Sequence, residues 1–311
     1  MATANLKILA RYTDSLSHLF IEHAVIERDG HSVTAFTADG RIVLPAAALG
    51  CLLLGPGTRI THGALGVLAQ SGCVVAWVGA EGLKFYAAGQ AKTRSGAGIE
   101  RQARHWADER LRMRVVRRLY EARFSERLDT SLTLQQVRGR EGARVRDIYR
   151  QLAERHGVVW QGRSYESGAW GEADPVNRAL SAANAALYAI VLSGIHSLGF
   201  SPALGFIHTG KQLSFVYDIA DIFKTGTSVP AAFEAAAQGA RGVESRAREF
   251  LRRRSSEAHL LDRVSSTLQQ LFESGGAGTD QEAIEERDAP GSLWDPAGNV
   301  EGGRQHAGDD S

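Results

Sequence analysis

Residues 176–199 read VNRALSAANAALYAIVLSGIHSLG, and this stretch decides the fold of the second half of the chain. It is rich in alanine, a strong helix former, and it is apolar on nearly every side of a helix. Asp174 precedes it as the expected N-cap, and Pro175 takes the first helical position. Because a helix that is apolar all round must be surrounded by protein, we expect it at the centre of a helical domain.

Other segments of the second half also have helical patterns. Residues 99–124 contain long helix formers and neither proline nor glycine, which predicts a helix. Residues 141–157 place Val145, Ile148 and Leu152 on one face and stop at a glycine, a residue typical of helix C-termini. The second half of the chain is therefore expected to be all-helical.

The first ninety residues have strand patterns instead. Residues 18–45 contain β-branched and aromatic runs that are broken by RDG and ADG, and Asp-Gly between such runs is a strong hairpin signal. Residues 61–72 predict a short helix that ends at Gly72, and CVVAWVG at 73–79 predicts a buried strand. We expect an α+β protein in which an N-terminal β-strand domain precedes a larger all-helical domain.

Composition shifts suggest where these parts begin and end. We expect the β domain at residues 1–90, a small and polar linker at 91–100, the helical domain at 101–272 and a tail at 273–311. The tail holds 10 acidic and 2 basic residues and few large apolar ones, so we expect it to be disordered.

Overall composition places the chain among soluble globular proteins, with 43% hydrophobic and 23% charged residues among 311. No apolar run reaches the roughly 18 residues that span a bilayer, and the N-terminus has no signal-peptide layout. The two cysteines do not predict a disulfide framework, which favours a cytoplasmic location and no membrane partner.

Charge is divided unevenly along the chain. Residues 101–150 hold 14 arginines and 7 acidic residues. A basic segment beside an acidic tail indicates a polyanionic partner, with nucleic acid first, while a set of solvated helix faces is the plainer interpretation.

The stretch FIHTGKQLSFVYDIADIFK at 206–224 concentrates charged residues in an apolar segment. Together with Gly205 it matches most of the phosphate-binding loop G-x-x-x-x-G-K-[ST], but Gln212 stands where a hydroxyl should bind the metal. The preceding segment contains Pro202 and is turn-like, whereas that loop follows a buried strand. An NTPase site is therefore disfavoured.

Helical geometry, at about 100° per residue, gathers the polar side chains of this stretch on one stripe. The stripe contains Lys211, Ser214, Asp218, Asp221 and Thr225. The opposite side contains Phe215, Val216, Ile219, Ile222 and Phe223. One interpretation is an amphipathic helix with a wet face. The other is a site for Mg²⁺ or Mn²⁺, because two aspartates at i, i+3 and His208 just upstream supply suitable oxygen and nitrogen ligands.

A second charged cluster lies in VRGREGARVRDIYR at 137–150. Four arginines, Arg138, Arg140, Arg144 and Arg146, surround Glu141. Arginines suit a phosphate backbone, and neighbouring glycines let such a backbone come close. Glu141 is then either a salt-bridge partner or a metal ligand, and both interpretations stay open.

Taken together, LQQVRGREGARVRDIY and GFIHTGKQLSFVYDIADIFK resemble the two signature segments of Cas1, the CRISPR-associated spacer-acquisition integrase, in its type I-E (Cascade-type) form. The resemblance runs from the N-terminal strands to about residue 270 and leaves the tail out. It implies that the helical domain is catalytic.

This resemblance also implies a site and an activity. Mg²⁺ or Mn²⁺ is expected on Glu141, His208 and Asp221, with Asp218 as a further catalytic acid. The implied reaction is metal-dependent DNA cleavage and integration, in which the 3′-hydroxyl of a captured DNA fragment attacks a phosphodiester at the CRISPR repeat. The implied partners are double-stranded prespacer DNA with single-stranded ends, repeat DNA, a second copy in a homodimer, and Cas2 bridging two dimers.

DNA contacts are implied residue by residue. They are Lys84, Arg138, Tyr165, Tyr188, Lys211, Tyr217, Lys224 and Arg248. Lysine and arginine suit phosphates, and tyrosine can stack on an unpaired base. His23 replaces a tyrosine that wedges DNA ends apart in related chains. A non-catalytic DNA-binding scaffold subunit and a branched-DNA repair nuclease are the alternative functions.

Overall fold

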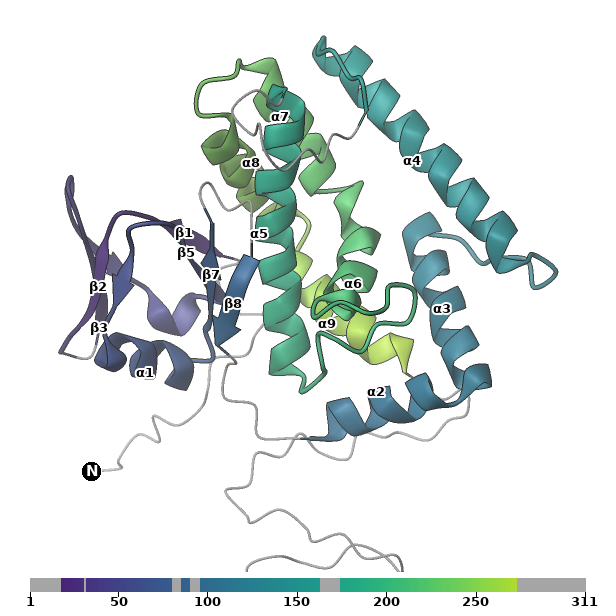
Figure 1. Ribbon diagram of the computed structural model, residues 1–311, viewed down its shortest axis with the longest axis horizontal. Coiled ribbons are helices and arrows are strands. Elements are labelled where there is room, and N and C mark those ends of the chain that lie inside the picture. Colours follow the sequence, from purple (N-terminus) through teal and green to yellow (C-terminus); the bar gives the residue numbers. More distant parts are fainter. Residues whose placement is uncertain (1–17, 31, 80–84, 90–95, 163–173, 273–311) are drawn as a thin grey trace, which may run out of the picture. The chain divides into compact units, whose positions relative to one another are not determined.

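Helix α5 (Pro175–Ser197) runs through the middle of the helical part in the computed structural model (Figure 1). The structure describes residues 18–30, 32–79, 85–89, 96–162 and 174–272. The helix begins as predicted, since the Asp174 side chain accepts a hydrogen bond from the Asn177 amide and Pro175 occupies the first turn. By length and composition α5 could cross a membrane, contrary to the expectation that no segment could, but 78% of its apolar window is buried inside the fold. It is a core helix.

Seven further helices are assigned to the described residues of the second half. They are α2 (Ala97–Ala107), α3 (Glu109–Phe124), α4 (Leu134–His156), α6 (Ser214–Lys224), α7 (Ser228–Ala237), α8 (Val243–Glu257) and α9 (Leu260–Leu271). The predicted helix over 99–124 is broken at Asp108, whose extended backbone ends α2 and whose side chain accepts from the Leu111 amide to cap α3. The break turns the chain direction between the two helices (Figure 1).

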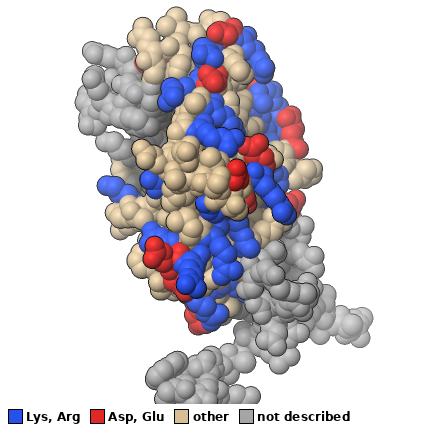
Figure 2. Space-filling model, turned by 90° about the vertical axis from the view of Figure 1, so that its right-hand side faces the viewer, with Lys and Arg blue, Asp and Glu red and all other residues tan. Residues whose placement is uncertain are grey.

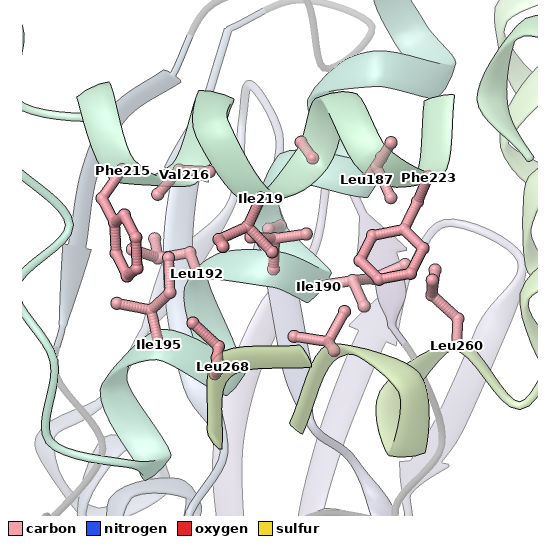
Figure 3. Close-up of a cluster of buried hydrophobic side chains, with 14 of the residues drawn as sticks. Leu187, Ile190, Leu192, Ile195, Phe215, Val216, Ile219, Phe223, Leu260 and Leu268 are labelled. Carbon is pink, nitrogen blue, oxygen red and sulfur yellow. The ribbon is translucent and has the colours of Figure 1, made fainter. Parts of the chain in front are cut away.

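The core of the helical part lies between α5, α6 and α9. Figure 3 shows Phe215, Ile219 and Phe223 of α6 pointing toward side chains of α5 and α9. These residues belong to the apolar side predicted for residues 206–224, so the period of that stretch was interpreted correctly. The opposite side of α6 is thereby left to carry polar groups.

Two four-stranded sheets are assigned to the described residues of the N-terminal part. The strands are β1 (Leu19–Ile21), β2 (Val25–Asp29), β3 (Ser32–Thr37), β4 (Gly40–Leu44), β5 (Cys51–Leu54), β6 (Arg59–Ile60), β7 (Val74–Val78) and β8 (Phe85–Gly89). One sheet has the order β4-β3-β2-β6 and the other β1-β5-β7-β8. The two predicted hairpins are β2–β3, with Gly30 at a positive φ of 62° in the turn, and β3–β4. Helix α1 (His62–Gln70) ends near Gly72 as expected.

One hydrophobic core joins the second sheet to the helices. Cys51 and Leu53 of β5 and Val74 of β7 belong to the same buried cluster as Val115 of α3 and Ile190 of α5. The interval 91–100, predicted as a linker, includes the first turn of α2 from Ala97, because Glu100 already donates its amide to the Gly96 carbonyl. Residues 90–95 and the predicted tail lie outside the described residues.

Candidate metal and nucleic-acid site

Asp218 organises the loop that carries His208. Its side chain is fully buried, and its Oδ2 accepts the amide hydrogens of Phe206 at 2.6 Å and Ile207 at 3.1 Å. Its Oδ1 accepts the His208 amide at 2.9 Å and lies 2.8 Å from His208 Nδ1. Because four contacts use both carboxylate oxygens, Asp218 acts here as a scaffold for the histidine loop.

The same loop is held from outside by α2. Gln102 is fully buried, its amide nitrogen donates to the Ser201 and Leu204 carbonyls, and its oxygen accepts from the Ser201 amide at 2.7 Å. Trp106 donates from Nε1 to the Gly205 carbonyl at 3.1 Å. A side chain at Gly205 would approach the His208 carbonyl within 2.3 Å, so only glycine lets the loop close this tightly.

Glu141 and Asp221 come from different helices and meet at one guanidinium. Arg123 of α3 donates from Nη1 to Glu141 Oε1 of α4 at 2.7 Å, and its Nη2 lies 3.2 Å from Asp221 Oδ2 of α6. Lys224 binds the other oxygen of Asp221 at 2.6 Å. The Arg123 side chain is 4% exposed, whereas those of Glu141 and Asp221 are 21% and 20% exposed. The carboxylates therefore face outward above a buried cation.

The charged groups of this cluster shift one another's pKa values. Burial alone would raise the pKa of Asp221, but the cations of Lys224 and Arg123 outweigh burial and lower it. Burial likewise opposes charge on Arg123, yet the carboxylates of Asp221 and Glu141 raise its pKa. The pKa of Lys224 is raised in the same way, chiefly by Asp221 against burial. The folded chain thus stabilises these groups in their charged forms.

His208 presents one ring nitrogen toward Asp221. A carboxylate only accepts hydrogen bonds, so in the neutral imidazole the contact with Asp218 assigns the proton to Nδ1, and Nε2 is then an acceptor. Nε2 lies 3.8 Å from Asp221 Oδ2. This spacing admits one ion bonded at about 2.1 Å to each atom, and a carboxylate behind a ligating histidine is the usual supporting arrangement.

The donor set therefore fits a small divalent cation, although the side chains are not yet arranged around one. Within the described ranges, no three His, Cys, Asp or Glu side chains are grouped closely enough to hold a metal ion. In this arrangement Arg123 and Lys224 contact both oxygens of Asp221, and Arg123 also contacts Glu141.

Three predicted DNA-binding residues lie beside this cluster. The rings of Tyr188 and Tyr217 are 5.1 Å apart, and Lys224 Nζ lies 5.0 Å from the Tyr188 ring centroid. The Tyr217 ring is also 5.9 Å from the His208 ring. Burial, followed by the neighbouring Tyr188, raises the pKa of Tyr217. A half-buried aromatic wall therefore adjoins the histidine.

The other predicted DNA-binding residues are not part of this group. Arg138 and Lys211 are exposed. Arg248 is buried, with its guanidinium 4.0 Å from the Phe20 ring centroid, so it joins α8 to the strand domain. Lys84 and Tyr165 lie outside the described residues. His23, at the position of the wedging tyrosine in related chains, is exposed at a positive φ of 51°.

Two details of the predicted clusters are corrected by the structure. Lys211 precedes α6, which begins at Ser214, so it does not belong to the helical stripe. The stripe is also not a wet face, since Asp218 is fully buried. Helical spacing placed both aspartates on one side of the helix, but the chain packs the 201–208 loop over that side.

Glu141 does have a salt-bridge partner, but it is none of the four arginines nearby in the sequence. Arg140 pairs with Glu126 at 3.0 Å, while Arg144 donates to the Arg123 carbonyl and, at 3.4 Å, to Thr225 Oγ1. Arg123 and Gln102 are thus organising residues that sequence reasoning missed, and Arg144, expected beside a phosphate backbone, instead contacts the Arg123 carbonyl. The sequence signal that could have identified Gln102 and Arg123 is their position on the apolar sides of amphipathic helices.

Comparison with known proteins agrees with the fold and with the two sequence motifs. A family model described as CRISPR associated protein Cas1 matches residues 122–273. A Thermus thermophilus protein named CRISPR-associated endonuclease Cas1 2 is 52% identical over 307 residues, which covers 98% of this chain and 94% of that protein. An Escherichia coli (strain K12) protein named CRISPR-associated endonuclease Cas1 is 39% identical and covers 82% of this chain and 85% of its own length.

A solved structure gives the same result. The chain in a crystal structure described as a TtCas1-DNA complex is 50% identical, superposes with a TM-score of 0.79, and covers 92% of this chain and 99% of its own length. Identity of this size over nearly the whole length is far above what a shared fold alone requires. The chain belongs to the Cas1 family of CRISPR-associated proteins.

Proposed function

We propose that this chain is a metal-dependent DNA endonuclease and integrase of CRISPR adaptation, of the type I-E form. In the proposed reaction, the 3′-hydroxyl of a captured DNA fragment attacks a phosphodiester at the CRISPR repeat, and the 3′-oxygen of the cleaved strand leaves. The observation that carries the proposal is that Arg123 contacts both Glu141 and Asp221 while Asp221 Oδ2 lies 3.8 Å from His208 Nε2, in a chain with this family membership.

Glu141, Asp221 and Nε2 of His208 would hold Mg²⁺ or Mn²⁺. When bound, such an ion neutralises phosphate charge and lowers the pKa of an attacking hydroxyl. The chain's own contribution is positional. Asp218 fixes the His208 ring, Gln102 holds the loop beneath it, and Lys224 ties Asp221 to the aromatic wall.

DNA is the proposed substrate because a chain 50% identical to this one was solved as a complex with DNA. Figure 2 shows many Lys and Arg side chains, and fewer acidic ones, on the face that carries α3 and α4. Arg138 and Lys211 are exposed and would contact the phosphate backbone. Tyr188 and Tyr217 would stack on an unpaired base next to His208.

We further propose a homodimer bridged to a second dimer by Cas2, acting in the cytoplasm on prespacer DNA with single-stranded ends. An exposed edge supports self-association. Among the strands of the described residues, β4 pairs with β3 alone, and its Ile42 and Val43 are 49% and 56% exposed. Unpaired edge strands with apolar side chains are ready surfaces for another chain.

Two variants test the activity. Glu141→Ala and Asp221→Ala each remove one proposed ligand and should abolish integration of a 3′-hydroxyl DNA fragment into a repeat-bearing plasmid in Mg²⁺ or Mn²⁺. Glu126→Ala is the matched control, because this exposed acid pairs with Arg140 and is not one of the proposed ligands. Integration at the unchanged rate by both site variants, with circular dichroism like the parent's, would overturn the proposed ligands. No integration by the parent chain itself would instead favour a DNA-binding scaffold with an idle site.

A further inference from the structure

The Arg123 guanidinium contacts two of the three residues that would hold a divalent cation. It contacts Glu141 Oε1 at 2.7 Å and Asp221 Oδ2 at 3.2 Å, and the latter oxygen is also the one that faces His208 Nε2 at 3.8 Å. Asp221 Oδ2 therefore contacts Arg123 and is also an atom that would bind the proposed metal ion.

This arginine is built into the core and does not lie loosely on the surface. Its side chain is 4% exposed, and its guanidinium carbon lies 5.2 Å from the Tyr120 ring centroid on the same helix. Its backbone carbonyl accepts from Arg144, which also contacts Thr225 at the end of α6. The ends of α3 and α6 are thus tied to α4 around the arginine.

The cluster needs a cation even without metal. Glu141, Asp218 and Asp221 contribute three carboxylates within one small region, and Arg123 and Lys224 contribute two positive charges. Like charges at such separations repel strongly in a partly buried site. Without Arg123, Glu141 would face the other carboxylates with no cation known to contact it among the described residues.

We propose that Arg123 is a resident counter-ion that competes with the divalent cation for Asp221 and Glu141, so that metal binding opens the Arg123–Asp221 ion pair. Arg123 is a positioning residue in this role. It keeps the two helices together while the site is metal-free, and it sets how tightly the metal is held. The inference rests on the proposed metal site and adds the device that regulates it.

The experiment measures Mn²⁺ binding to the full-length, metal-stripped chain by isothermal titration calorimetry, with thermal unfolding in parallel. Arg123→Gln keeps a polar side chain but removes the charge. We expect its metal-free Tm to fall by about 5 °C or more, since a buried ion-pair partner is lost. We expect its Kd for Mn²⁺ to drop about tenfold or more, because a competing charge is gone.

Two further variants make the result decisive. Arg123→Lys keeps the charge but cannot fork between two carboxylates, so its Kd should fall between the parent's and that of Arg123→Gln. This variant decides the question if Arg123→Gln does not fold. Arg253→Gln is the matched control, because Arg253 pairs with Glu234 at 2.7 Å on the surface, and its Kd should equal the parent's.

The outcomes separate the two proposals. The counter-ion role is overturned if the Arg123 variants bind Mn²⁺ with an unchanged or higher Kd while Asp221→Ala abolishes binding. That result leaves the proposed metal site standing. No Mn²⁺ binding by the parent chain itself overturns both. Tighter binding in Arg123→Gln together with a lower metal-free Tm supports the counter-ion role, and a purely structural salt bridge would change the Tm alone.

Discussion

Asp218 shows how one buried carboxylate can position a histidine, here the proposed metal ligand His208. Three backbone amides and one ring nitrogen point at its two oxygens. The loop from Phe206 to His208 is not part of any helix or strand, so these contacts replace the regular hydrogen bonds that would otherwise hold it. The position of Nε2 is consequently set by a residue that need not touch substrate.

The substitution Asp218→Asn tests this role. One oxygen becomes an amide nitrogen, which cannot accept from the amides it would face, so a buried donor loses its partner. We expect the free energy of unfolding to fall by about 3 kcal/mol and integration to fall with it. Urea denaturation measures the first effect. Asp262→Asn, an exposed acid on α9, serves as the control, and equal stability of the two variants would argue against the scaffold role.

Sequence reasoning located part of this site. His208, Asp218 and Asp221 lie in one short stretch of the sequence, with His208 just before the helix that carries both aspartates, so local spacing was enough to group them. Arg123 stands 18 residues before Glu141, and Gln102 contacts a loop 99 residues away. Such partners are chosen by tertiary packing, which no local pattern encodes. The convergence of Glu141 with Asp221 was implied only by the family resemblance.

At the scale of elements, α2 holds the loop that carries His208 in place. Gln102 and Trp106 both reach the loop that precedes His208, and the break at Asp108 lets α2 run in a different direction from α3. The break escaped prediction because aspartate is acceptable both inside a helix and as an N-cap. By contrast, α5 was predicted with its cap, since its alanine-rich and apolar pattern leaves no local alternative.

Removing the α2 clamp should therefore weaken the site. Gln102→Ala deletes one donor group and one acceptor and leaves the Ser201 amide and two carbonyls unpaired inside the fold. We expect a loss of about 2–3 kcal/mol in the free energy of unfolding and a lower rate of integration. Chemical denaturation and the plasmid assay measure these. Gln212→Ala, at an exposed position, should change neither, and a parent-like Gln102→Ala would show that the clamp is dispensable.

The stability of the fold should depend on pH where His18, just before β1, lies beside arginines of α8. His18 is buried, and burial together with the charges of Arg252 and Arg248 lowers its pKa from 6.5 to about 4. Because the folded state resists protonation, the stability contributed by neutral His18 is complete above pH 6.5 and is lost as the pH falls toward 4.

The corresponding measurement compares the free energy of unfolding at pH 7 and pH 5. His18 alone should account for a decrease of about 2 kcal/mol in the parent chain. His18→Gln cannot be protonated, so its decrease should be smaller by that amount. His62→Gln replaces an exposed histidine and should behave like the parent. Equal pH dependence in all three chains would contradict the assignment.

At the scale of the whole molecule, the β and helical parts share one hydrophobic core. We therefore do not expect either part to be stable without the other. Cys51, Leu53, Val74, Ala76 and Val78 from the second sheet are all buried in the cluster that contains α5 and α6. Burial of one large apolar side chain contributes about 1.5–3 kcal/mol to stability. Loss of these contacts would therefore remove an amount of free energy comparable to the usual net stability of a protein, about 5–15 kcal/mol.

A chain cut down to residues 96–272 should therefore lose cooperative unfolding. We expect it to keep helical far-ultraviolet circular dichroism while its near-ultraviolet signal fades and it binds a hydrophobic dye, as expanded states with loose packing do. The control is a chain ending at residue 273, which retains every core residue named here and should unfold as the full-length chain does. A sharp calorimetric transition in the 96–272 fragment, at the temperature of the parent, would mean that the helical part is a self-sufficient domain and that the shared core contributes little.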